Sequence, residues 1–488
     1  MKKRTSIVLL IAMLASLAAC GESVGEMQTG DGSDTTVFDT TTAEPEYTLP
    51  EKDMGGWELS ILNPTEDSLT WANTRINMEE LNGDVLNDAF FNRNQMLMEK
   101  YNFVLKVDEV KHSQIPTTLQ TNVLAGDDAY QIYVMEEGKL QSFLPYNMDW
   151  NEIPGMNLDK VWWNPAATSV YNINGRQTAL AGNMSLSAVS RSVCMVFNKD
   201  IWAEYGDPKM NLYDLVKNNE WTLDKCLEVA LWVSSDLDGD TKWTENDLYG
   251  LFMGRGFKGY IASFLTGCGM NFTAENDDGV QEFTLNKNER GIGLMTKLMD
   301  AVGQDGYTYY TGDVHTGKPA NFFENGHALF SQRVPNDIYK LRDMEDDIGI
   351  LPMPKYDASQ ENYIAAAWGG AVWTLSKTFD MANAENLGIV LEAMSYTTYN
   401  DIVPVYKEIA LKTKTARDDE SSEMLDIIFD NIYFDFGTNI MYDAVFAETF
   451  LKDIFKSWSG DIIVSSMENA LPTIVAYMDD INTLTQEA

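Results

Sequence analysis

Apolar and polar positions follow two different periods along the first part of the folded chain. Residues 57–62 alternate singly, residues 85–101 place apolar side chains at helical spacing, and residues 103–107 return to the strand pattern. Residues 115–124 then follow a helical pattern and residues 130–135 a strand pattern. This strand–helix–strand order predicts an α/β fold with a largely parallel sheet, in which ligand groups lie at the carboxyl ends of the strands.

A second group of apolar runs lies between residues 322 and 376. We expect a helix that ends at Gly326 and is followed by a strand. A further apolar run breaks at Pro352, and the run from Ile364 to Leu375 carries Trp368-Gly369-Gly370 at its centre. Because paired glycines inside a strand-like run indicate a bend or a close backbone approach, we expect this run to cross between two halves of the molecule beside a ligand.

Length and charge restrict the fold and the partners. The chain has 488 residues, which exceeds one ordinary domain, so two lobes with their own cores are expected. Asp and Glu number 74 against 35 Lys and Arg, which gives a net charge of −39. This charge argues against nucleic acid and against an anionic bilayer as direct partners.

The N-terminus predicts export. Lys2-Lys3-Arg4 precedes an apolar run over residues 7–14, and Leu17-Ala18-Ala19-Cys20 ends the segment. This arrangement resembles a bacterial lipoprotein signal, whose cysteine is lipidated. The alternatives are an ordinary secretory signal or a short membrane span, although the run is shorter than the ~20 residues that cross a bilayer. Residues 21–54 read as a flexible tether, so we expect an exported protein that is lipid-anchored through Cys20 to the outer face of the cell membrane.

Three further cysteines allow at most one internal disulfide, and the sequence does not say which pair would form it. They are Cys194, Cys226 and Cys268. Their spacing matches no metal-ligand motif, which favours buried structural thiols.

Several short segments occur in a characteristic order along the exported chain. The segments are residues 57–62, Asn87-Asp88-Ala89 with Arg93-Asn94, Trp162-Trp163-Asn164, Phe197-Asn198-Lys199-Asp200, Trp221-Thr222-Leu223-Asp224, Phe322 to Phe330, Gly349 to Pro354, and Trp368-Gly369-Gly370. Together they resemble extracellular solute-binding proteins of family 1, the binding subunits of ABC importers. The resemblance implies a monomeric two-lobe, periplasmic-binding-protein-like α/β fold that closes on a solute and presents it to a permease.

The resemblance also implies how the chain divides between the lobes. It places the N-lobe at residues 55–180 and 372–412, the C-lobe at residues 190–366 and 415–488, and the crossings near residues 178–191, 368–371 and 410–416. The ligand would lie in the cleft between the lobes.

Relatives in this family commonly bind oligosaccharides, and several side chains here suit that chemistry. Sugar rings stack on aromatic side chains, while their hydroxyls need charged or amide partners in a closed cleft. By their positions after strands and at crossings, the expected ligand-binding residues are Trp71, Glu136, Asn183, Arg191, Arg333 and Trp368. We therefore expect a carbohydrate ligand. A peptide or another polar solute is the alternative.

Each of these residues also has a structural alternative. Trp71 can cover the core of the N-lobe, and Arg191 and Arg333 can form ion pairs in so acidic a chain. Trp162 and Trp163 fit packing better than ligand stacking.

One segment resembles a calcium-binding loop. Residues 236–247 place ligand oxygens at the spacing of an EF-hand, with Asp236, Asp238, Asp240, the backbone carbonyl of Lys242, and Asp247 as the expected metal ligands. The loop departs from the pattern because Thr241 replaces the turn glycine and Asp247 replaces the longer glutamate. A structural Ca²⁺ is therefore expected, with a solvated acidic turn as the alternative; no other cofactor is required.

Enzyme motifs are weak or incomplete. Residues 254–259 match G-x-G-x-x-G in isolation, and the approach to a P-loop at residues 312–318 fails at Pro319. The three histidines form no H-E-x-x-H, and G-x-S-x-G is absent from the sequence. We predict a non-enzymatic protein. A glycan hydrolase with paired carboxylates and a sensor or adhesive lipoprotein remain the rival interpretations.

Overall fold

The computed structural model describes residues 47–253, 258–276, 280–304, 306–310, 322–338, 341, 343–411, 418–457 and 459–487. Within the chain, Leu49–Ala488 forms one compact unit. The predicted export signal with Cys20, most of the tether, and most of the crossing near residues 410–416 lie outside the described residues. A search of the described helices finds none with the length and hydropathy to span a bilayer.

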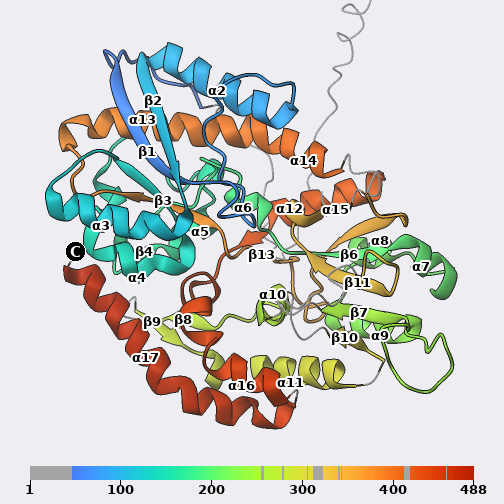
Figure 1. Ribbon diagram of the computed structural model, residues 1–488. Coiled ribbons are helices and arrows are strands. Elements are labelled where there is room, and N and C mark those ends of the chain that lie inside the picture. The colour runs from blue at the N-terminus through green and yellow to red at the C-terminus, as the bar shows by residue number, and fades with distance from the viewer. Residues whose placement is uncertain are drawn as a thin grey trace, which may run out of the picture. The chain divides into compact units, whose positions relative to one another are not determined.

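The first sheet contains the strands that single alternation predicts near the start of the folded chain (Figure 1). Its order is β14-β3-β1-β2, with β1 parallel to both β2 and β3. The bounds are β1 Trp57–Pro64, β2 Phe103–Val110, β3 Ile132–Glu136 and β14 Ala371–Leu375. Strand β14 comes from a distant part of the chain and runs antiparallel to β3. The predicted parallel pairing is therefore confirmed for β1 to β3, whose carboxyl ends meet at one edge.

Helices with clear start and stop signals pack on this sheet. Helix α2 (Val85–Tyr101) packs against β2, α3 (Ile115–Ala125) packs against β3, and α13 (Ala384–Thr397) packs against α2. Helix α2 begins where Asp84 accepts the N–H of Asn87 at 2.8 Å. It ends where Asn102 adopts a left-handed conformation with φ of 49°, so local signals set both of its ends.

The second sheet has the order β10-β7-β11-β6-β12 and mixes parallel with antiparallel pairs. Its strands are β6 Cys194–Asn198, β7 Tyr249–Met253, β10 Thr308–Tyr310, β11 Ala328–Arg333 and β12 Ile348–Pro352. Helix α9 (Leu223–Val233) packs against β7 and α15 (Asp419–Asp430) against β12. A Cβ at Gly250 would lie 2.0 Å from the carbonyl oxygen of Ala230, so glycine permits the approach of α9 to β7.

The remaining strands have two or three residues each, and the remaining α-helices range from four residues in α4 to 25 in α17. The strands are β4 Asn172–Ile173, β5 Arg176–Gln177, β8 Thr273–Glu275, β9 Gln281–Phe283, β13 Ala365–Ala366 and β15 Ile432–Tyr433. The helices are α4 Leu140–Phe143, α5 Pro165–Val170, α6 Ser187–Ser190, α7 Lys199–Tyr205, α8 Leu212–Lys217, α10 Lys258–Gly267, α11 Glu289–Gly303, α12 Pro335–Ile338, α14 Val403–Leu411, α16 Phe450–Ser457 and α17 Ile463–Glu487, with a π-helix at Gly437–Phe446.

The expected helix before Gly326 is wrong over residues 322–326, which form turns instead. Phe322 and Phe323 are both buried, and the Phe322 ring packs 5.7 Å from that of Tyr249. Gly326 has a φ of 75°, so the stop signal is correct. Tertiary packing of two adjacent aromatic rings therefore fixes this segment, where the local pattern indicated helical turns.

The three described cysteines are free thiols, and all three are buried. Burial raises the pKa of the Cys194 thiol to about 12, and burial likewise raises that of Cys268 to about 12. The interpretation as buried structural thiols is therefore confirmed for Cys194, Cys226 and Cys268.

Candidate functional site

Two segments that connect the sheets run side by side in opposite directions. Residues 178–193 lead from β5 to β6, and residues 364–373 run through β13 into the first half of β14. Their backbones pair at three points: Leu180 with Trp373, Ser192 with Ala367, and Val193 with Ala366, the last through an N–H···O bond of 2.7 Å. Because this pairing begins at β14 in one sheet and ends beside β6 in the other, it brings side chains from both parts of the body together.

Arg191 lies at the centre of this pairing and joins two of the predicted tryptophans. Its Nε donates to the carbonyl oxygen of Trp368 at 3.0 Å, and its Nη1 donates to that of Trp71 at 3.3 Å. The guanidinium carbon is 5.3 Å from the centre of the Trp368 ring, within cation–π range. The structure thus brings the Trp368 side chain and the Trp71 backbone to Arg191, while the Trp71 ring packs edge-on against His112 at 5.6 Å. We call Trp71, Arg191 and Trp368, with Glu137 and Gly369, the junction.

Backbone shape at the junction explains the paired glycines. Gly369 has a φ of 72°, and a Cβ there would lie 3.0 Å from Nη2 of Arg191. The Trp368 ring lies against α10, where a Cβ at Gly259 would be 2.1 Å from its Cη2 atom, and its Nε1 donates to Ser263 Oγ at 2.9 Å. Glycines on both sides therefore let the indole and the guanidinium approach backbone.

A buried carboxylate, Glu137, completes the junction. Its Oε1 accepts the N–H of Gly369, and its Oε2 accepts hydrogen bonds of 3.1 Å from the Tyr171 hydroxyl and the Asn439 amide. Burial raises the pKa of Glu137 to about 7, and these donors only partly oppose the effect. This carboxylate fixes the bend at Gly369 and can exchange a proton near neutral pH.

The sequence pattern indicated Glu136, the residue before Glu137, as the ligand-binding acid. Glu136 is the last residue of β3, is half-buried, and lies opposite Ala371 in the sheet. Two consecutive acids after a buried strand were visible in the sequence, but the exact end of β3 decides which one turns inward. That boundary is set by pairing with β14, a distant segment, so the alternation alone does not identify Glu137.

Asn183 and Arg333 have other principal contacts. The Asn183 amide donates to the carbonyl oxygen of Trp162 at 3.0 Å. Arg333 forms an ion pair of 3.0 Å with Glu324, and its guanidinium carbon lies 5.7 Å from the centre of the Phe323 ring. Arg333 therefore forms an ion pair, which was the structural alternative, and these contacts do not bring either Asn183 or Arg333 to the junction.

The junction is closely packed. Glu137, Arg191, Trp368 and Gly370 line a cavity of about 10 Å³, together with residues from α6 and the segment before the π-helix. That volume holds about one water molecule. A solute of the size of a sugar can therefore enter only if the groups of the junction separate.

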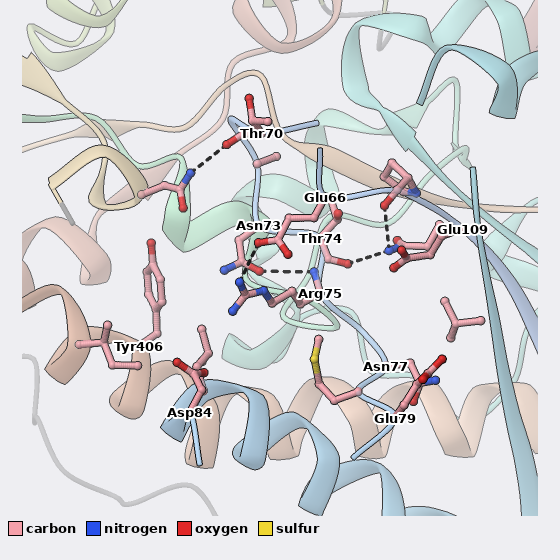
Figure 2. A pocket seen from close by; sticks show the side chains of 18 of the residues that line it. Glu66, Thr70, Asn73, Thr74, Arg75, Asn77, Glu79, Asp84, Glu109 and Tyr406 are labelled. Carbon is pink, nitrogen blue, oxygen red and sulfur yellow. Dashed lines mark hydrogen bonds and ion pairs between the residues drawn. The ribbon is translucent and has the colours of Figure 1, made fainter. Parts of the chain in front are cut away.

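A much larger cavity, of about 630 Å³, lies beside the segment that carries Trp71 (Figure 2). Thr70 and Ala72, on either side of Trp71, both line it. Its other walls are the carboxyl ends of β1 and β2, the connection from β1 to α2, Pro335-Asn336 and helix α14. Because carboxylates dominate its charged groups, we call it the acidic cavity.

The predicted calcium ligands fall into two groups. One ligand oxygen from each of Asp236, Asp238 and Asp240 lies within 4.8 Å of the others. Asp247 is fully buried and instead accepts the backbone N–H groups of Leu237 at 3.0 Å and Thr244 at 2.7 Å. Three acidic side chains can therefore face one cation, while the fourth closes the base of the loop.

No protein-family model and no curated protein sequence matches the chain, but its structure is similar to several solved structures. The cyclic α-maltosyl-1,6-maltose binding protein from Arthrobacter globiformis matches with a TM-score of 0.57 and 16% identity, covering 89% of this chain and 100% of that one. A cyclo/maltodextrin-binding protein complexed with maltotetraose matches with a TM-score of 0.53 and 12% identity, covering 88% of this chain and 96% of that one.

A third structure agrees with these. An ABC substrate-binding protein from Listeria monocytogenes, in complex with cycloalternan, matches with a TM-score of 0.50 and 13% identity, covering 89% of this chain and 100% of that one. At such identities the similarity establishes the fold. The predicted two-lobe, periplasmic-binding-protein-like α/β fold is therefore confirmed.

Proposed function

We propose that this protein is the extracellular solute-binding subunit of an ABC importer and that it captures an oligosaccharide between its lobes without breaking a bond. The observation that carries the proposal is the junction, where Trp71, Arg191 and Trp368 meet on the segments that connect the two sheets. The fold likeness supports it, since solved structures of this fold hold maltotetraose and cycloalternan.

The chemistry of the junction suits a sugar. The indole ring of Trp368 offers a flat apolar surface to a sugar face, and the guanidinium of Arg191 offers several fixed donors to hydroxyl groups. In the packed structure these groups bind one another and Arg191 is 8% exposed, so a sugar must replace the contacts of Arg191 with Trp368 and Trp71. Binding energy would then be coupled to the relative movement of the lobes, which is the state change that a permease can recognise.

Export and anchoring form a separate part of the proposal. Lipidation of Cys20 would hold the protein at the outer face of the cell membrane, where it passes solute to the permease. Globomycin, which blocks lipoprotein signal cleavage, should make the precursor accumulate with residues 1–19 attached. Unchanged processing would instead indicate an ordinary secretory signal.

The central test is ligand binding by the soluble protein from Gly21 onward, without the cysteine that is expected to carry lipid. Isothermal titration and thermal unfolding should be compared for linear maltodextrins, cyclic glucans, monosaccharides and short peptides. A ligand that binds only the folded protein raises the thermal unfolding midpoint. At a ligand concentration of 100 Kd it adds about 2.7 kcal/mol to the free energy of unfolding. A rise with glucans alone supports the proposal, whereas a rise with peptides alone would keep the fold and reject the carbohydrate assignment.

We also propose that Asp236, Asp238 and Asp240 hold a structural Ca²⁺, with the Lys242 carbonyl as a further ligand. The support is the backbone: Thr241, at the position where an EF-hand uses glycine for its sharp turn, has a φ of 67°. A β-branched residue in this conformation is strained, so the loop keeps the calcium-loop turn despite the substitution.

A further inference from the structure

The π-helix at Gly437–Phe446 contacts two parts of the body that lie far from it in the sequence. π-Helical turns are rare and often occur at functional sites. This helix packs against the 3₁₀-helix Glu137–Lys139, which directly follows β3 of the first sheet. Its last residue, Phe446, stacks on the ring of Phe272, between α10 and β8, with ring centroids 5.1 Å apart. The π-helix therefore links the strand end beside the junction to a separate pair of aromatic rings.

Asn439, in the first turn of this helix, has both ends of its side-chain amide bound. Its Nδ2 donates to Glu137 Oε2 at 3.1 Å and to the carbonyl oxygen of Ala367 at 2.8 Å. Its Oδ1 accepts the backbone N–H of Asp435 at 3.0 Å. The residue is 3% exposed, so water has little access to these bonds. One amide therefore joins three segments that are far apart in the sequence.

Both partners of the Asn439 amide nitrogen belong to the surroundings of Trp368. Ala367 directly precedes Trp368, and Glu137 Oε1 accepts the N–H of Gly369, which directly follows it. The bridge from Glu137 to Ala367 therefore fixes the backbone on both sides of the indole. Asn439 can influence a solute through the position of this backbone, which makes it a positioning residue.

The bridge favours the packed form of the junction. The cavity between the groups of the junction holds about one water molecule, so a sugar can enter only after these groups separate. Any separation that moves Glu137 away from Ala367 breaks the bridge and leaves a buried donor or acceptor without a partner. Solute affinity is then reduced by the fraction of molecules in which the junction is packed.

We propose that Asn439 is a latch, which holds the junction packed while no solute is bound and releases Glu137 or Ala367 when a solute enters. The latch regulates the site of the proposed function, and its effect on affinity rests on that function. A weaker latch increases the population with a separated junction, so it raises both the association rate and the affinity. A side chain that only supports packing around a solute would have the opposite effect.

Hydrogen exchange of the solute-free protein tests the latch without any ligand. Asn439→Ala removes both bonds of the bridge. We expect the Gly369 amide, which donates to Glu137, to exchange at least about fivefold faster in this variant, while the amides of β1 and β2 keep the parent rate. Asn122→Ala, which removes a side-chain hydrogen bond on α3, is the matched control and should leave exchange at Gly369 unchanged. Equal exchange at Gly369 in Asn439→Ala and in the parent protein would overturn the proposal.

Titration with maltotetraose tests the link to solute binding. We expect Asn439→Ala to bind maltotetraose at least about threefold more tightly than the parent protein, with a faster association rate. Equal or weaker binding by this variant, where the parent protein binds, would reject the latch. If neither protein binds any glucan, the oligosaccharide function fails, and the exchange rates alone decide on the latch. Asn439→Leu, which keeps most of the side-chain volume, takes the place of Asn439→Ala if the smaller side chain lowers the unfolding midpoint too far for either measurement.

Discussion

Arg191 binds the backbone of residues that are far apart in the sequence, and this makes the junction dependent on single side chains. Trp71 and Trp368 present carbonyl oxygens to the guanidinium, and the ring of Trp368 lies beneath it. Arg191 can therefore affect ligand binding in two ways: through its own contact with the ligand, and by holding Trp71 and Trp368 in place. Residue-scale tests of the junction must therefore separate loss of a ligand contact from loss of packing.

Trp368→Ala is expected to weaken oligosaccharide binding by about tenfold or more, because one stacking surface is removed. Titration of the ligand found in the binding screen gives the affinity. Trp232→Ala is the matched control, since Trp232 is 52% exposed at the end of α9 and its loss should leave affinity unchanged. An unchanged Kd for Trp368→Ala in a protein that unfolds at the parent midpoint would remove Trp368 from the site.

Trp162 and Trp163 illustrate packing at the same scale. They are 6% and 0% exposed, and their indole N–H groups donate to Glu392 at 2.9 Å and 2.5 Å, so their interpretation as packing residues is confirmed. Glu392 also accepts the backbone N–H of Asn157 at 3.0 Å. One carboxylate on α13 therefore satisfies three donors from a separate segment.

Glu392→Ala should lower the free energy of unfolding by at least about 2 kcal/mol, because it leaves buried N–H groups without an acceptor. Glu392→Gln retains one acceptor oxygen and should lose less. Urea unfolding of the three proteins measures the difference. A Glu392→Ala variant within about 0.5 kcal/mol of the parent would show that water replaces the carboxylate at no cost.

At the scale of elements, the loop of residues 236–247 is held by its own backbone hydrogen bonds as well as by any ion. Asp236 accepts the N–H groups of Gly239 at 2.7 Å and Thr241 at 2.8 Å, and Asp247 anchors both ends of the loop. The loop connects α9 to β7, which lies between β10 and β11 in the second sheet. Binding of an ion in this loop should therefore increase the stability of the second sheet.

We therefore expect Ca²⁺ to raise the thermal unfolding midpoint and a chelator to reverse the rise. Asp240→Asn should abolish the effect, because it removes one charge from the group of three carboxylates. Asp300→Asn, at an exposed position of α11, serves as the control for a general charge effect. An equal response to Ca²⁺ in the parent and in Asp240→Asn would place the ion elsewhere.

At the scale of the whole molecule, two buried carboxyl groups link stability to pH. Burial raises the pKa of Glu137 to about 7, and burial likewise raises that of Asp435 to about 7. Both groups titrate near pH 4 in an unfolded chain, so between about pH 4 and 7 the folded protein binds more protons than the unfolded one. The contribution of these two groups to the free energy of unfolding is largest at the acid end of this window, and it is lost as the pH rises through 7.

The unfolding equilibrium constant should therefore increase with pH across this window, by up to about tenfold per pH unit for each group. Glu137→Gln is neutral at every pH and should remove one of the two contributions, which makes the profile shallower. Chemical unfolding at several pH values from 4 to 8 gives the slope. Equal slopes for the parent and for Glu137→Gln would show that Glu137 is ionised in the folded protein throughout.

Local patterns in the sequence were enough to locate the first elements and to assign the fold class. Single alternation and helical spacing located β1, α2, β2, α3 and β3, and the glycines at residues 369–370 marked the bend at the junction. These signals are local, because backbone geometry and side-chain period act over a few residues. Trp71, Arg191 and Trp368 could be chosen in this way, because each lies next to a strand end or a crossing.

The way in which those elements meet depends on contacts that exist in the folded protein alone. It selected Glu137 over Glu136, paired Arg333 with Glu324, and gathered the carboxylates of the acidic cavity. Two of these outcomes depend on segments that are far apart in the sequence, such as β14 against β3 and α14 across the acidic cavity from the end of β1, whereas Glu324 lies nine residues before Arg333. Desolvation and hydrogen-bond satisfaction are properties of such distant contacts, so no local pattern encodes them in readable form.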